Sequence, residues 1–280
     1  MQIQKSFKNN TNSFYIIPTP IGNLEDITLR TLKILQELDI LYCEDKRVTQ
    51  KLLNYYEIKV TLHTYNEFSF SKESQNILSH LENNKKIGLV SDAGMPGISD
   101  PGYKIIKLIK QHNYNVVILP GAVAYILPQV YATVNEQPFM FKGFLSKNKT
   151  QYHKEIEEII QAKFNTIIYE SPHRINKTIS IINIAKPKTK ILLARELTKI
   201  YEEYLQGTAQ EINEYLVENK IKGEIVLIIS PIEEKIEVDY VQEVQNLITA
   251  GFSKKDAIKE IAQKYNISKN KLYDKVLKEL

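Results

Sequence analysis

Short apolar runs alternate with amphipathic segments along the first half of the chain. Between the runs, apolar residues recur at helical spacing over 27–38 and 72–81 and from Tyr103 to about His112. The runs themselves are typical of buried strands and lie at 14–17, 39–43, 60–65, 87–90 and 116–119. This βα alternation predicts a mostly parallel sheet with helices on both faces.

The second half continues with a more mixed α/β pattern. It predicts strands near 139–143, 166–169, 190–194 and 224–230, a short segment at 200–205, and helices over 151–162, 172–185 and 209–219. Three short helices follow from about 239, with Ser253 and Ser268 as N-caps in a helix-turn-helix-like pattern. We therefore expect an N-terminal α/β domain (1–119), a second α/β domain (120–232) and a small, basic helical region (233–280).

The stretch after the run at 87–90 breaks every regular pattern. Three Gly and two Pro fall within residues 91–102, together with Asp92 and Asp100, before helical spacing resumes at Tyr103. Connections of this type usually take 2–6 residues, so the length alone favours a functional loop over a purely structural one. Gly lets backbone approach a ligand closely. Asp100, just before Pro101, is predicted as a helix N-cap.

The ends of five further predicted strands carry Gly, Pro or charged residues. Each pattern also has an ordinary structural explanation. Residues 18–22 and 120–124 are Pro/Gly turns, and Asp26 after the first is a predicted N-cap. Residues 44–47 (EDKR) also suit a helix N-terminus. In 170–174 (ESPHR), Pro172 also suits the first position of a helix. In 194–198 (ARELT), Arg195 and Glu196 are also explained by an ordinary ion pair at the surface. Together, six such ends predict one shared site at the edges of the sheets.

Composition narrows the class of protein. Hydrophobic residues make up 43% and charged residues 25% of the 280, which is ordinary for a globular protein. No apolar run reaches the roughly 20 residues of a membrane span, and the N-terminal residues lack the apolar stretch of a signal peptide. A single Cys, Cys43, excludes internal disulfides and Cys-based zinc sites, so a cytoplasmic location is expected.

Charge is distributed unevenly. Eight Lys against four acids over 253–280 give this segment +4, which equals the net charge of the whole chain. Such a tail binds polyanions or is simply a solvated helical surface. Only four of the 37 basic residues are Arg, namely Arg30, Arg47, Arg174 and Arg195, so each is a candidate for a contact that needs a planar guanidinium.

Common catalytic signatures are missing from the sequence. It has no GxGxxG, no GxxxxGK[ST], no GxSxG and no HExxH, and its five His are scattered. We therefore expect no metal site.

Several segments together resemble a known family. PTPIGNLEDITLRTL, CEDKRVT, VSDAGMPGISDPGY, LPGAVA, YESPHRI, ARELTKIYEE and KGEIVLII stand in the order and spacing of the tetrapyrrole-methylase-like superfamily. They resemble its ribosomal branch, the RsmI family, over about residues 14–230. The resemblance implies two α/β domains with a cleft between them, a homodimer, and S-adenosylmethionine as cofactor. It also implies 2′-O-methylation of a cytidine (1402) of 16S rRNA in the decoding centre of the small ribosomal subunit.

The resemblance also implies which residues surround the cofactor. These are Pro20 and Ile21, which would line the methyl-transfer site, and Asp92, Ala93, Gly94, Met95, Pro96, Ala122, Val123, Ala124, Tyr169, Ala194, Gly223, Glu224 and Ile225. Two segments depart from the family: PGPSA is PGAVA here, which removes a hydroxyl at Val123, and the small-residue segment is ATVNE at 132–136.

Ribose methylation needs a proton acceptor and contacts to RNA. The candidate bases are Glu25, Asp26, Glu44, Asp45 and His173, and the sequence does not choose among them. The four Arg and Lys254, Lys255, Lys269 and Lys271 are the candidate RNA contacts. Two alternatives remain open: a tetrapyrrole (precorrin-type) methyltransferase on the same fold, and a non-catalytic RNA-binding or assembly protein.

Overall fold

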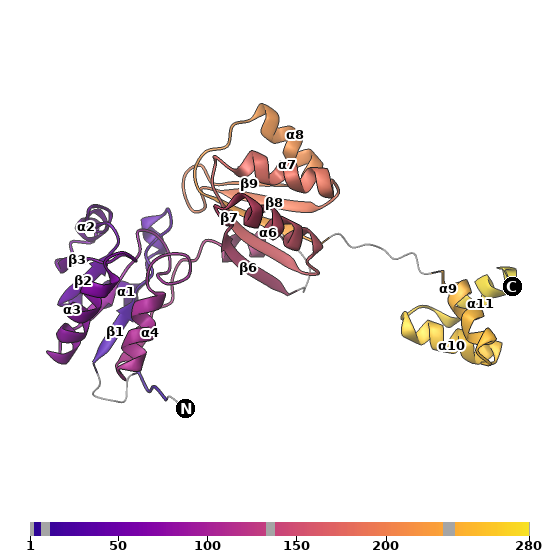
Figure 1. The fold of residues 1–280 in the computed structure, drawn as a ribbon, viewed down its shortest axis with the longest axis horizontal. Helices are drawn as coiled ribbons and strands as arrows, with labels where there is room; N and C mark the ends of the chain where they lie inside the picture. The colour runs from indigo at the N-terminus through magenta and orange to yellow at the C-terminus, as the bar shows by residue number, and fades with distance from the viewer. Residues whose placement is uncertain (1–2, 7–11, 133–137, 232–238, 280) are drawn as a thin grey trace. The chain divides into compact units, whose positions relative to one another are not determined.

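The computed structural model describes residues 3–6, 12–132, 138–231 and 239–279. Contacts within the chain divide it into two compact units, Met1–Ile232 and Glu233–Leu280. The first unit contains two five-stranded sheets and the second contains three helices (Figure 1). No helix among the described residues is both long and apolar enough to cross a membrane.

The first sheet is entirely parallel, with strand order β3-β2-β4-β1-β5. Its strands are β1 (Ser13–Ile16), β2 (Ile40–Cys43), β3 (Thr61–Thr64), β4 (Ile87–Leu89) and β5 (Asn115–Ile118). The connecting helices are α1 (Leu29–Glu37), α2 (Lys46–Tyr55), α3 (Phe70–Glu82) and α4 (Tyr103–Gln111), and α5 (Ile126–Tyr131) follows β5.

Helices cover both faces of this sheet. Leu35 of α1 and Leu53 of α2 pack with Leu41 in one apolar cluster. Ile77 of α3 and Ile109 of α4 belong to the cluster on the other face. Because parallel strands are buried on both faces, they read as continuous apolar runs in the sequence.

The second sheet is mixed, with order β6-β7-β10-β8-β9. Only β6 and β7 are parallel, and the other pairs are antiparallel. Its strands are β6 (Phe139–Phe144), β7 (Asn165–Glu170), β8 (Lys190–Arg195), β9 (Glu203–Thr208) and β10 (Ile225–Ser230). Its helices are α6 (Lys149–Gln161), α7 (Ile175–Ala185) and α8 (Ala209–Glu218).

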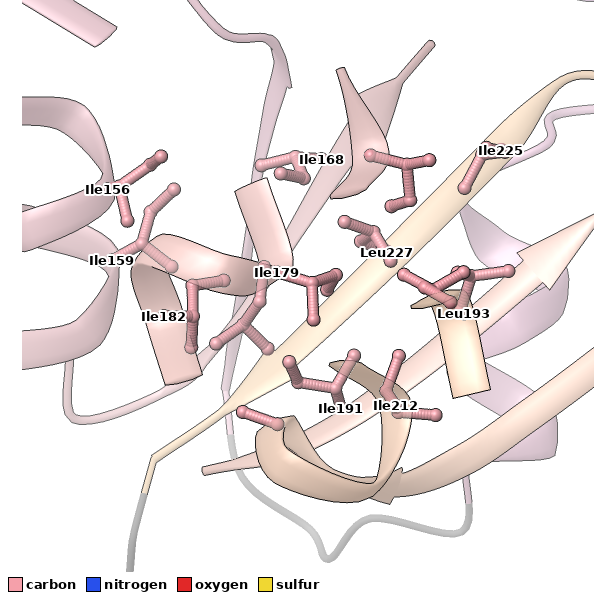
Figure 2. Packing of buried hydrophobic residues seen from close by; sticks show 14 of the residues in the cluster. Ile156, Ile159, Ile168, Ile179, Ile182, Ile191, Leu193, Ile212, Ile225 and Leu227 are labelled. Carbon is pink, nitrogen blue, oxygen red and sulfur yellow. The ribbon is translucent and has the colours of Figure 1, made fainter. Parts of the chain in front are cut away.

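The three helices of this sheet contribute to a single Ile- and Leu-rich core on one face. Figure 2 shows Ile156, Ile179 and Ile212, one from each helix, in the cluster that also contains Leu193 and Leu227 of the central strands. On the opposite face, Val226 and Ala194 belong to a second cluster, against which Ile21 and Ala124 from loops of the first sheet pack. These contacts bring the strand ends of the two sheets to one place.

The second unit has a core of its own. It consists of α9 (Tyr240–Thr249), α10 (Lys254–Lys264) and α11 (Lys269–Glu279). Val244, Ile258 and Val276, one from each helix, are fully buried. The hydroxyl of Ser253 accepts a hydrogen bond from the Asp256 backbone N–H, so the predicted cap of α10 is confirmed.

The α/β architecture predicted from the sequence is confirmed, but several local predictions are wrong. Asp26 does not cap α1, because a 3₁₀ turn (Leu24–Asp26) intervenes and Thr28 accepts the hydrogen bond from Thr31 instead.

Three further boundaries differ from the prediction. Gly102, not Asp100, is the residue before α4, and its φ of +153° is one that residues with a side chain rarely adopt. The turn after Pro172 delays α7 until Ile175. The segment predicted at 200–205 is strand β9, which begins only at Glu203, where it pairs with Arg195.

Candidate functional site

A pocket of about 450 Å³ lies where strand ends of the two sheets meet. Its size falls in the range of small-molecule sites. On the side of the first sheet it is lined by residues after β1, β2, β4 and β5: Ile21, Glu44, Asp92, Ala93, Gly94, Met95, Ile98, Ser99, Asp100, Val123 and Ala124. On the side of the second sheet the lining residues are Phe144, Tyr169, Glu170, Ser171, Pro172, Leu197, Gly223, Glu224, Ile225 and Val226.

Two loops of the first sheet are joined at the pocket. The Thr19 N–H donates to the Gly94 carbonyl at 2.9 Å, and the Gly94 N–H donates back to Thr19 at 3.0 Å. Gly94 has φ of +79°, and a Cβ there would lie 3.3 Å from Cγ2 of Ile21. The positive φ favours Gly, and a Cβ would crowd Ile21, which explains part of the unusual composition of 91–102.

A group of carboxylates forms one wall. Oδ1 of Asp92 accepts a hydrogen bond from the Asp45 backbone N–H at 3.0 Å, which ties the 91–102 loop to the start of α2. Burial raises the pKa of Glu44, and the negative charges of Asp92 and Asp100 add to the shift. Burial likewise raises the pKa of Asp100. Such a wall favours a positively charged ligand.

The opposite wall is fixed by a second network. Gly223 has φ of +89°, and a Cβ there would collide with the carboxylate of Glu196. That carboxylate accepts from the Glu224 N–H at 3.0 Å and from Nζ of Lys199 at 2.9 Å, while Nζ of Lys199 also donates to Glu224 at 2.9 Å. Desolvation by burial opposes protonation of Lys199, but its two carboxylate partners raise the Lys199 pKa overall.

The structure brings most of the residues expected at the cofactor into this pocket. Pro20, Pro96, Ala122 and Ala194 do not line it. Ala194 is fully buried opposite Val226 in the sheet, and Val226 lines the pocket in its place. The eleven that do line it are Ile21, Asp92, Ala93, Gly94, Met95, Val123, Ala124, Tyr169, Gly223, Glu224 and Ile225. Burial raises the pKa of Tyr169 to about 12.

Of the five candidate bases, Glu44 is the one that lines the pocket. Glu25, Asp26 and His173 are exposed outside it. The Asp45 carboxylate accepts from the Arg47 N–H and guanidinium, with Nη2 of Arg47 at 2.6 Å, and these hydrogen bonds lower its pKa to about 2.

The four Arg occupy different environments. Arg30 is exposed on α1, and the 88% exposed side chain of Arg47 pairs with Asp45. Nε of Arg174 donates to the buried Glu170 at 2.9 Å, and Nε of Arg195 donates to Glu203 at 2.5 Å. Lys255, Lys269 and Lys271 are exposed in the second unit, where Lys254 is half-buried.

Sequence reasoning missed several lining residues. Phe144 pairs directly with Tyr169 across the parallel strands β6 and β7, so the strand pairing would have indicated it. The sequence predicts Asp100 as a helix cap, and in 170–174 it points to His173 and not to Glu170. The predicted departure at 133–136 lies outside the described residues. Among the described residues, no group of three or more His, Cys, Asp or Glu could hold a metal ion.

Comparisons with known proteins agree with this arrangement. Residues 13–213 match the family model of tetrapyrrole (corrin/porphyrin) methylases. The chain is 38% identical to ribosomal RNA small subunit methyltransferase I of Bacillus subtilis, over 97% of each protein. It is 36% identical to the protein of the same name from Halalkalibacterium halodurans, over 98% of each. The chain belongs to the ribosomal RNA small subunit methyltransferase I family, within the tetrapyrrole methylases.

Solved structures of other tetrapyrrole methylases share the fold. Cobalt precorrin-4 methyltransferase superposes with a TM-score of 0.60 at 17% identity, covering 78% of this chain and 94% of that one. Uroporphyrin III C-methyltransferase from Thermus thermophilus gives 0.56 at 13% identity, covering 78% and 97%. The predicted family and fold class are thus confirmed. The chain is a methyltransferase, and its cofactor is S-adenosylmethionine.

Proposed function

We propose that this methyltransferase acts on 16S rRNA in the small ribosomal subunit and methylates the ribose 2′-oxygen of a cytidine, at the position numbered 1402. The observation that carries the proposal is 36–38% identity, over nearly the full length, to proteins named for small-subunit rRNA methylation. The proposed substrate also places the activity in the cytoplasm, where ribosomal subunits reside.

The pocket residues fit S-adenosylmethionine. Apolar side chains such as Ile21, Met95 and Val123 suit the adenine and the methionine chain, and Asp92 and Glu224 suit its cationic groups. The positive φ of Gly94 and Gly223 leaves backbone accessible on both walls. When bound, the cofactor supplies an activated methyl group on a sulfonium. Positioning of the two reactants can then supply much of the rate.

We propose Glu44 as the base for the ribose hydroxyl. When bound, the cofactor would donate its methyl group to the 2′-oxygen and leave as the thioether, while the carboxylate of Glu44 would accept the hydroxyl proton. Glu44 lines the pocket, and the raised pKa of its carboxyl makes it a better proton acceptor than an ordinary Glu.

The decisive experiment incubates the protein with radiolabelled S-adenosylmethionine and one of two acceptors, small ribosomal subunits or a precorrin-type tetrapyrrole. Label in the RNA, at a ribose by nuclease digestion, is expected. Label only in the tetrapyrrole would overturn the proposal in favour of the activity suggested by the fold neighbours. Absence of cofactor binding by calorimetry would favour a non-catalytic RNA-binding or assembly role.

The protein is also proposed to act as a homodimer. Helix α5 exposes four apolar or aromatic side chains to solvent, namely Ile126, Leu127, Val130 and Tyr131, of which Val130 is 75% exposed. A second copy that covers this surface would remove the cost of exposure. Light scattering should give the mass of a dimer for the native chain and of a monomer for Val130→Lys. A native monomer would contradict the proposal.

A further inference from the structure

Phe144, the last residue of β6, is an exposed aromatic side chain at the edge of the pocket. It is 60% exposed, although it also lines the pocket. Its ring contacts Tyr169 at 5.4 Å between centroids with the planes tilted by 57°. A large aromatic surface left open beside a binding pocket is suited to stack on a planar group.

A β-bulge directs Phe144 toward this position. The register of β6 against β7 shifts between Phe141 and Gly143, and Gly143 has φ of +71°. Bulges of this kind turn the following side chain and are frequent beside active sites. A Cβ at Gly143 would lie 3.5 Å from Oγ of Ser99, so the loop containing Asp100 is adjacent to the bulge.

The turn that follows Phe144 is held rigidly. Leu145 is buried, and the Ser146 N–H donates to Glu155 at 2.8 Å. Nη1 of Arg174 donates to the Leu145 carbonyl at 3.1 Å and to the Ser146 carbonyl at 3.3 Å. The Arg174 side chain is therefore engaged inside the protein, as an anchor for the turn.

The carboxylate that pairs with this anchor is buried, and its hydrogen bonds are satisfied. Glu170, 2% exposed, accepts from Arg174 at 2.9 Å and from the Thr178 hydroxyl at 2.6 Å. A charged pair with additional hydrogen bonds fixes its geometry strongly. Phe144 is thus presented before any substrate arrives, which reduces the entropic cost of binding.

Cations follow the aromatic ring in the same segment. Lys147 and Lys149 are exposed, and neither forms an ion pair with a described residue. Lys149 also lines a shallow hollow on the first turns of α6 together with Thr150, His153, Lys154 and Glu157. An aromatic ring flanked by unpaired cations is the combination that binds unpaired nucleotides, by stacking on the base and by contact with phosphates.

We propose that Phe144 is the stacking platform for the base of the target nucleotide, flipped out of the RNA, and that Lys147 and Lys149 contact the neighbouring phosphates. This inference rests on the proposed function. The ribose that enters the pocket carries its base at a fixed distance, and Phe144 offers an exposed ring at the same pocket. Access to the 2′-oxygen requires the target nucleotide to leave its base pair. A stacking platform then holds the unpaired base.

The test compares Phe144→Ala, Phe144→Leu and Phe144→Trp with native protein. We expect kcat/KM for methylation of small subunits to fall about 10- to 100-fold for Ala and Leu, and Trp to retain most of it. The Kd for S-adenosylmethionine should change less than twofold in all three. Phe68→Ala removes a fully exposed Phe outside the pocket lining and should leave both values unchanged.

Three results would overturn the platform: native kcat/KM in Phe144→Ala, equal activity of the Leu and Trp variants, or a loss of cofactor affinity that matches the loss of activity. The last would assign Phe144 to the cofactor's adenine. A second arm measures binding of a short oligoribonucleotide containing a fluorescent cytidine analogue, whose emission is quenched by stacking. If quenching requires an aromatic residue at position 144 but no methylation occurs, the proposed function is rejected and the stacking platform is retained.

Discussion

At the scale of single residues, Glu44 differs from the other carboxylates predicted as bases by its surroundings. It must be deprotonated to accept a proton, so activity rises as pH increases through its pKa. Because burial and the nearby Asp92 and Asp100 raise this pKa above the ordinary Glu value of 4.5, the acidic limb of the kcat/KM profile should lie above that value.

Substitution of Glu44 tests this directly. Glu44→Gln should reduce kcat by about 10²- to 10⁴-fold and abolish the acidic limb, while cofactor affinity is retained. Asp100→Asn removes one of the charges that raise the pKa of Glu44, so it should move the limb to lower pH. Both variants are measured at saturating cofactor over pH 4.5–8, with saturating small subunits for kcat and with subunits below KM for the kcat/KM profile. An unchanged profile in Glu44→Gln would remove it from the chemistry.

Asp92 permits a separate prediction, on binding. Its carboxylate both accepts from the Asp45 N–H and supplies negative charge at the pocket. Asp92→Ala removes both, and we expect cofactor affinity to fall about 10- to 100-fold, since hydrogen bonds to charged groups are worth about 1.5–3 kcal/mol. Asp92→Asn keeps an oxygen that can accept from the Asp45 N–H, so this variant tests the effect of the negative charge alone. Calorimetric Kd values equal to native in both variants would exclude Asp92 from the site.

At the scale of elements, the loop 91–102 shows which parts of the site could be read from sequence. Its Gly and Pro content predicted an irregular ligand loop, and strand alternation predicted the parallel first sheet, because both signals are local. Phe144 and Glu170 could not be placed in the same way. The position of Phe144 depends on the bulge at Gly143, and that of Glu170 on the pairing of β7 with β10, and both are set by tertiary contacts.

Two glycines of this loop separate the effect of backbone strain on stability from the effect on cofactor binding. Gly94 and Gly97 have φ of +79° and +82°, so Ala at either position should cost about 1–2 kcal/mol of unfolding free energy. Only Gly94 lines the pocket and exchanges hydrogen bonds with Thr19. Gly94→Ala should therefore also weaken cofactor binding, and Gly97→Ala should not. Chemical denaturation and calorimetry measure the two effects, and equal Kd values would contradict the assignment.

At the scale of the whole molecule, the chain consists of two units with separate cores. Within the second, residues 253–280 carry +4, and the acidic residues of 233–243 balance this charge. The exposed Lys269, Lys271 and Lys275 on α11 form no ion pair with a described residue. Helices α10 and α11, which hold the eight Lys of 253–280, are expected to bind the RNA backbone, with a contribution that decreases as salt increases. The first unit contains all the residues that line the pocket.

Removal of 253–280 alone would leave α9 without α10 and α11 and would expose the buried Val241 and Val244, so the cut belongs before 239. The protein ending at 231 should bind S-adenosylmethionine with native affinity, because no lining residue is lost. Its KM for small subunits should increase at least tenfold at low salt. A full-length variant with Lys269, Lys271 and Lys275 changed to Gln keeps the core and should show part of the increase, with a shallower dependence on salt. Native methylation by the truncated protein would refute an RNA-binding role for the second unit.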